Sequence, residues 1–193
     1  MRVVIVASGP SAQGFVPPPG VVVIAVNGAI EWLVRADYWF TLDPSPINLE
    51  RMHRPRHGVT YCAALNEPAP LWVRRFVRVA ARGQEPEPGT PEWWLWRWSA
   101  VKTLSTEHGC IHTGNSAWGA LGLAYHLGAE RVALVGVDAS ADERIEGGRC
   151  RDLSHLPLLF ESALPQIELL NCGAMRSRVP KMTIKEGMEW LTN

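Results

Sequence analysis

Short apolar runs alternate with polar turns along the first third of the chain. The runs cover residues 3–7, 21–26, 38–42 and 59–63. Runs of this length, rich in β-branched residues, are typical of strands buried on both faces of a parallel sheet. Helix candidates at residues 30–34 and 46–53 lie between them. The alternation predicts an α/β fold: a single Rossmann-like, mostly parallel sheet with helices on both faces.

Residues 113–138 predict a turn, a helix, a second turn and a strand in direct succession. Small and apolar residues recur there at spacings of three and four, which gives one apolar helix face. Asn115 or Ser116 can cap the helix start with a side-chain oxygen. Gly128 suits its end. The strand at 132–137 then leads to Asp138, so this unit predicts the centre of the fold.

The remaining segments are less uniform. A helix at 158–164, a strand at 167–170 and an amphipathic helix at 184–191 are predicted, and residues 84–91 read as loop. Residues 71–82 mix arginine with apolar residues and favour neither helix nor strand. Residues 92–99 hold four tryptophans, and Trp94, Trp96 and Trp98 would share a face if the segment were extended. Core packing, an acceptor-binding wall, a platform for bases and an oligomer contact through residues 93–98 remain open.

Length and composition narrow the class of protein. A chain of 193 residues suits one domain, and its net charge of zero gives no bulk attraction to nucleic acid or an acidic membrane. The cysteines form no CxxC motif, which favours reduced thiols in a cytoplasmic protein. The N-terminus lacks a signal-peptide pattern. The longest apolar run is far short of the roughly 20 residues of a membrane span, so none is expected.

Polar residues follow several of the predicted strands. Carboxyl ends of parallel strands share one edge of a sheet, where open α/β sheets bind ligands. The helix start near residue 115 adds backbone N–H groups and a dipole that favour a phosphate. The sequence therefore predicts a nucleotide site formed by Ser8, Gly9, Pro10, Ser11, Asn27, Asp43, Gly114, Asn115, Ser116 and Asp138.

Residues 139–153 have no apolar period and contain adjacent glycines, which predicts a mobile lid over the strand ends. His108, Cys110 and His112 alternate, so in a strand they would share a face as zinc ligands do, but no fourth ligand follows at a recognisable spacing. A polar strand without a metal site is the prediction there.

The order GPS, VNG, ADYWFTLDP and TGNSAWGALGLAYHLGAERVALVGVD resembles the bacterial CMP-sialic acid sialyltransferases, which have a Rossmann-like GT-A fold. It is also similar to uncharacterised phage proteins of that architecture and, more distantly, to the MptE-like pterin diphosphokinases. The resemblance implies a nucleotide sugar, CMP- or UDP-linked, as donor and a hydroxyl acceptor. Ser8, Asn27, Asn115 and Ser116 match positions that contact the nucleotide in that family.

The resemblance also implies catalytic roles. A histidine beyond the lid is the general base in that family, and His155 matches it. Two tyrosines steady the departing phosphate in the sialyltransferases, but this chain has Ser140 near the first position and no tyrosine after Tyr125. Ser140 is therefore expected near the leaving phosphate, and Arg144, Arg149 or Arg151 is expected to neutralise its charge, since guanidinium groups pair well with phosphate.

Two other functions remain compatible with the sequence. One is Mg²⁺-dependent pyrophosphoryl transfer, as in the MptE-like family, with Asp43 and Asp138 as candidate ligands. The other is a non-catalytic module that binds a nucleotide or nucleic acid through the tryptophan stretch. Strict dependence on Mg²⁺ would favour the first, and a strong fall of affinity with salt the second.

Overall fold

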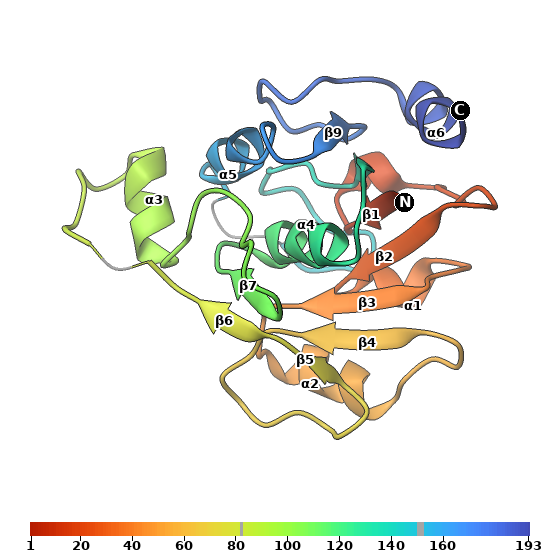
Figure 1. Ribbon diagram of the computed structural model, residues 1–193, viewed down its shortest axis with the longest axis horizontal. Coiled ribbons are helices and arrows are strands. Elements are labelled where there is room, and N and C mark those ends of the chain that lie inside the picture. Colours follow the sequence, from red (N-terminus) through yellow and green to blue (C-terminus); the bar gives the residue numbers. More distant parts are fainter. Residues whose placement is uncertain (82, 150–152) are drawn as a thin grey trace.

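The computed structural model describes residues 1–81, 83–149 and 153–193. It confirms the predicted α/β architecture: a seven-stranded sheet, parallel throughout, has the order β5-β4-β3-β2-β1-β8-β9, and β6 and β7 pair separately (Figure 1). The strands are β1 (Arg2–Val6), β2 (Val22–Val26), β3 (Tyr38–Thr41), β4 (Thr60–Ala63), β5 (Arg74–Arg75), β6 (Val77–Val79), β7 (Cys110–His112), β8 (Arg131–Val135) and β9 (Glu168–Asn171).

Helices cover both faces of the large sheet, as predicted. One face packs against α4 (Ser116–His126) and α5 (Leu156–Ser162). The other packs against the 3₁₀ turn η1 (Pro10–Ala12), α1 (Ala29–Trp32), α2 (Pro46–His53) and α6 (Ile184–Thr192). None of these helices, nor α3 (Pro91–Arg97), has the length and apolar character needed to cross a membrane; this holds for the described ranges of the chain.

The central strand β1 shows why the apolar runs predicted the sheet well. Val3 and Ile5 point into the core beneath α4, whereas Val4 and Val6 point into the core on the opposite face. All four are fully buried. Each such side chain contributes roughly 1.5–3 kcal/mol on burial, so a strand apolar at every position is stable only between two layers.

The strand order reverses at β1. From β1 the chain runs outward through β2, β3, β4 and β5, and then returns to place β8 and β9 on the other side of β1. Loops leaving neighbouring strands in opposite directions open a crevice at their carboxyl ends, which is where doubly wound sheets bind ligands. A ligand site is therefore expected at the switch point between β1 and β8.

Helix α4 is buried more completely than the single predicted face implied. Its residues from Ser116 to Ala124 are all buried, because the helix lies between the sheet and α5. Gly119 permits the close approach: a Cβ there would lie 2.5 Å from Cε1 of Phe40 and 2.9 Å from Cδ1 of Leu42. Gly122 has more room, since the nearest atom to its Cβ would be Cδ1 of Ile111 at 3.2 Å.

This difference predicts opposite effects for two equivalent substitutions in α4. Alanine at either position gains helix propensity of about 1 kcal/mol. Gly119→Ala should nevertheless lower the free energy of unfolding by about 1–2 kcal/mol, because overpacking against the buried Phe40 ring costs about 1–3 kcal/mol. Gly122→Ala should be neutral or stabilising. Urea denaturation of both variants measures this, and equal stability of the two would refute the packing account.

The tryptophan stretch is helical, so the extended alternative for residues 92–99 is wrong. Thr90 caps α3 by accepting from the N–H of Trp93 at 3.1 Å, and Pro91 takes the first helical position, where its missing N–H is harmless. Trp94 and Trp98 stack one turn apart with ring centroids 6.5 Å apart. Figure 1 shows α3 set apart from the large sheet.

In the segment at 71–82, for which the sequence favoured neither helix nor strand, the described residues include two very short strands, β5 and β6. Cys62, Cys110 and Cys172 are free and buried. Burial raises the pKa of the Cys62 thiol and of the Cys172 thiol to about 11, so these two thiols stay protonated at neutral pH and are poor nucleophiles.

Candidate functional site

A hollow lies at the switch point, over the carboxyl ends of β1, β2 and β8. It encloses about 70 Å³ within a larger depression of about 580 Å³ that includes space open to solvent. It brings together many predicted site residues: Ser8, Gly9, Pro10, Asn27, Asn115, Ser116, Asp138, Ser140 and Arg144. It also includes residues that the sequence did not single out: Ala7, Val26, Ala117, Gly136, Val137, Ala139, Asp142, Glu146, Leu153 and Leu156.

The turn after β1 forms one wall. The ladder between β1 and β8 continues past both strands, because the N–H of Gly9 donates to the carbonyl of Gly136 at 2.9 Å. A Cβ on Gly9 would lie 2.5 Å from that carbonyl oxygen, so only glycine fits this approach. Ser8 is 7% exposed, and its Oγ is buried without a hydrogen-bond partner among the described residues. A buried hydroxyl of this kind is normally satisfied, so it marks a position where a ligand can bond.

Asp138 fixes this turn in place. Its Oδ2 accepts from the N–H of Ser11 at 2.9 Å, and its Oδ1 accepts from the Ser11 hydroxyl and from the N–H of Ala174 at 2.8 Å. The carboxylate thus ties η1 and the segment after β9 to the end of β8. Asp138 lines the hollow, but its oxygens are committed to the fold, which assigns it a positioning role. Ser11, predicted to bind nucleotide, serves this anchor and does not line the hollow.

The start of α4 forms a second wall and carries the predicted cap. Asn115 is the N-cap, and its Oδ1 accepts from the N–H of Ala117 at 2.7 Å. The Ser116 hydroxyl accepts from the N–H of Leu42 at 3.0 Å, which joins the helix start to the end of β3. The eleven-residue helix directs its positive dipole end into the hollow. Gly114 lies outside the hollow, because it packs against Trp118 and Leu159.

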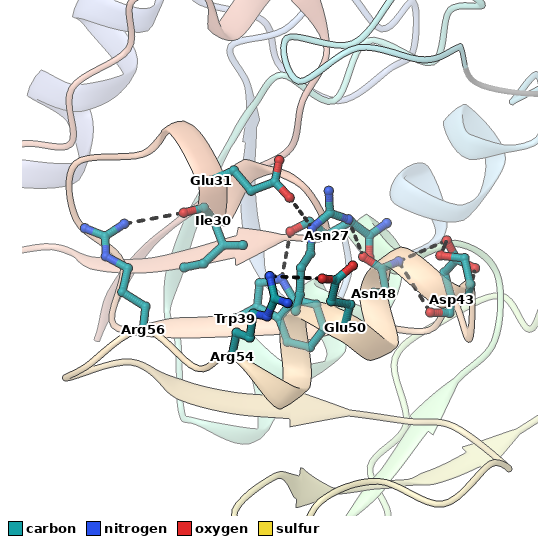
Figure 2. Close-up of polar contacts among 11 residues, drawn as sticks. Asn27, Ile30, Glu31, Trp39, Asp43, Asn48, Glu50, Arg54 and Arg56 are labelled. Atoms are coloured by element: carbon teal, nitrogen blue, oxygen red, sulfur yellow. Dashed lines mark hydrogen bonds and ion pairs between the residues drawn. The ribbon is translucent and has the colours of Figure 1, made fainter.

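The turn after β2 forms the third wall. Asn27 has a φ of 49°, a left-handed conformation that asparagine tolerates better than most residues. Its Oδ1 accepts from the Thr41 hydroxyl at 2.7 Å and its carbonyl accepts from Nε1 of Trp39 at 2.7 Å, as drawn for Trp39 in Figure 2. These bonds hold the turn in register with β3.

Residues 139–149 cover the hollow as a hairpin. Glu143 and Arg149 pair across it in an antiparallel bridge. The N–H of Arg144 donates to the carbonyl of Gly148, and the N–H of Gly147 donates to the carbonyl of Arg144, both at 2.9 Å. Arg144 lines the hollow, whereas Arg149 is exposed and does not. Arg151, also predicted to hold phosphate, lies outside the described residues.

Asp43, which was predicted to contact the nucleotide, is not among the residues that line the hollow. Its carboxylate accepts from the backbone and hydroxyl of Ser45, each at 3.0 Å, and from Nδ2 of Asn48 at 3.0 Å at the start of α2 (Figure 2). Asp43 and Asp138 therefore do not share a site as magnesium ligands. Over the described ranges, no group of three or more metal-binding side chains occurs.

His155 does not line the hollow either. It is 1% exposed and occupies the N-cap position of α5, between Leu153 and Leu156, whose side chains do reach the hollow. A general base must contact the proton that it removes. In this arrangement the imidazole of His155 is closed off from solvent and is not part of the hollow's lining.

A second hollow of about 340 Å³ lies between α1 and α2, and three arginines line it. Arg51 pairs with Glu31 at 2.8 Å, and Arg54 pairs with Glu50 at 3.1 Å. Arg56 donates to the carbonyls of Leu33 and Val34 (Figure 2 shows its bond towards Ile30). Arg51 and Arg56 thus join α2 and the turn after it to α1 and the residues that follow α1, while Arg54 pairs within its own helix; we therefore assign this hollow a structural role.

The geometry defines a Rossmann-like α/β protein with a polar hollow at its switch point. No family model matches the chain, and no curated protein matches it. Among solved structures, the fold is similar to that of the MAf glycosyltransferase from Magnetospirillum magneticum AMB-1, with a TM-score of 0.53 and 13% identity. The match covers 94% of this chain and 33% of that protein, so the chain spans about a third of its length. The similarity is one of fold.

Proposed function

We infer that the protein transfers a glycosyl group from a nucleotide sugar to a hydroxyl acceptor. The observation that carries this proposal is the convergence of the α4 start and Arg144 on one hollow at the switch point of the sheet. A helix N-terminus and a guanidinium group together suit a phosphate. The likeness in fold to a glycosyltransferase supports sugar transfer over other nucleotide chemistry.

The walls suggest how the donor lies. The phosphate lies at the α4 start, near Asn115, Ser116 and Arg144, where developing charge on a leaving phosphate is stabilised. The nucleoside lies towards the turns after β1 and β2, beside Ser8 and Asn27. A CMP- or UDP-linked sugar fits this order of groups. Asp142 is an exposed carboxylate at the rim of the hollow, and it is better placed than the buried His155 to deprotonate an acceptor.

A thermal-shift comparison of CMP, UDP and ATP, each with and without Mg²⁺, tests the proposal. A ligand present at one hundred times its dissociation constant stabilises the folded state by about 2.7 kcal/mol. We expect CMP or UDP to raise the melting temperature without Mg²⁺, and the matching nucleotide sugar to be consumed when acceptor is supplied. Stabilisation by ATP with Mg²⁺ alone would favour pyrophosphoryl transfer instead. If none of these nucleotides stabilises the protein, the proposal fails.

A further inference from the structure

One carboxylate of the covering hairpin reaches the end of β2. A Cβ built on Gly28 would lie 1.9 Å from Oε1 of Glu146, 2.3 Å from its Cδ and 2.6 Å from its Cγ. The backbone of Gly28 is helical, with φ −67° and ψ −16°, a conformation open to any residue. A side chain at this position would therefore have to displace the Glu146 carboxylate, and its absence makes room for Glu146.

One oxygen of the Glu146 carboxylate, Oε2, is buried without a hydrogen-bond partner from the described residues. The Ser8 hydroxyl lines the same hollow, and its Oγ is likewise buried without a hydrogen-bond partner among the described residues. Leaving a charged acceptor and a hydroxyl buried and unbonded is unfavourable, so such groups normally have a partner. Two of them in one hollow point to a ligand that supplies hydroxyl or amino hydrogens.

We propose that Glu146 recognises the ribose of the bound nucleotide by accepting hydrogen bonds from its vicinal hydroxyls; this inference depends on the function proposed above. A carboxylate only accepts, and ribose hydroxyls donate. In dinucleotide-binding sheets an acidic residue near the second strand holds the ribose in this way. Here Asn27 follows that strand, with its Oδ1 already bonded to Thr41, and Glu146 brings the missing carboxylate from the hairpin.

The position of Glu146 also orients the nucleotide. An anionic phosphate is repelled by a carboxylate and attracted by the α4 start and Arg144, so the two ends of the nucleotide are sorted by charge. The enclosed space of about 70 Å³ is smaller than the roughly 300–1,000 Å³ of typical ligand pockets. The nucleotide therefore enters as the hairpin shifts, and the hairpin then returns Glu146 to the ribose. The bond from the N–H of Ile145 to the carbonyl of Ser8, at 3.0 Å, is the contact that must open.

Binding of CMP and 2′-deoxy-CMP, measured by calorimetry, tests this role; UDP and 2′-deoxy-UDP replace them if UDP stabilises the protein more. We expect the wild-type protein to prefer the ribose form by about tenfold, as the loss of one hydrogen bond to a charged group implies. Glu146→Ala should reduce this preference to within about twofold. Glu143→Ala is the matched control, because Glu143 is exposed on the same hairpin and does not line the hollow.

The outcomes separate this inference from the function on which it depends. If the wild-type protein binds the nucleotide but does not discriminate ribose from deoxyribose, Glu146 does not read the sugar. The same conclusion holds if Glu146→Ala keeps the wild-type preference. Equal tightening of both forms by Glu146→Ala would show that the side chain merely fills the hollow, and would also overturn the proposal. If neither form binds the wild-type protein, the nucleotide function itself is rejected.

Discussion

Replacing Asp138 by alanine should lower the free energy of unfolding by about 3 kcal/mol, because it removes the acceptor of three part-buried hydrogen bonds, each of which contributes about 1 kcal/mol. The donors are the backbone groups of Ser11 and Ala174, and the Ser11 hydroxyl loses its acceptor as well. For a chain of 193 residues this corresponds to a fall in melting temperature of about 6–12 °C. Urea denaturation gives the free energy directly.

Asp142→Ala is the matched control for this loss. Asp142 also lines the hollow, but it is exposed, so its removal should change stability by less than about 0.5 kcal/mol. Asp138→Asn should lie between the two, since the amide keeps one acceptor oxygen but turns an NH₂ group towards N–H donors. Asp138→Ala that is no less stable than Asp142→Ala would show that the carboxylate does not anchor the turn.

Reversing the charge of Arg144 should weaken binding of the phosphate group about 100-fold, which is about 2.7 kcal/mol. Arg144→Glu removes charge-assisted hydrogen bonds and places a second negative charge beside the phosphate. Affinity for the nucleoside without phosphate, cytidine or uridine, should change little. Calorimetric titration with the nucleotide and with its nucleoside separates these two effects.

Arg149→Glu provides a control of equal net charge. Arg149 lies on the same hairpin as Arg144, but it is exposed and outside the hollow. If Arg144 contacts the phosphate, Arg149→Glu should alter nucleotide affinity by less than about threefold, as expected for a screened surface charge. Equal losses in the two variants would indicate a general field effect and would remove Arg144 from the site.

The elements that the sequence predicted best are those whose signal is local and strong. The strands β1, β2 and β8 are apolar at nearly every position, and only burial on both faces explains that pattern. Helix α4 carries its cap at Asn115 and begins where the cap predicts. In α3 the alternation of Trp94, Trp96 and Trp98 suggested an extended segment, whereas the residues form a helix. Thr90 followed by Pro91 was the better guide, because an N-cap threonine before a proline at the first helical position marks the start of a helix.

The site was harder to predict, because the sequence shows which residues follow a strand but not where their side chains point. Asp43 follows β3 as expected, yet its carboxylate turns towards Asn48 at the start of α2. His155 stands at the expected place in the chain, but α5 buries it. Glu146 was missed because its segment has no periodicity. Its placement depends on a long-range contact between the hairpin and the turn at Ser8.

Nuclear magnetic resonance of the ¹⁵N-labelled protein, titrated with CMP or UDP, tests the central claim most directly. We predict that backbone amide signals of residues 8–9, 115–117 and 144–146 shift together and saturably. The guanidinium-lined hollow at Arg51 and Arg54 serves as the internal reference, and its signals should stay in place. Shifts confined to that second hollow, or to the α3 tryptophans, would contradict a nucleotide site at the switch point of the sheet.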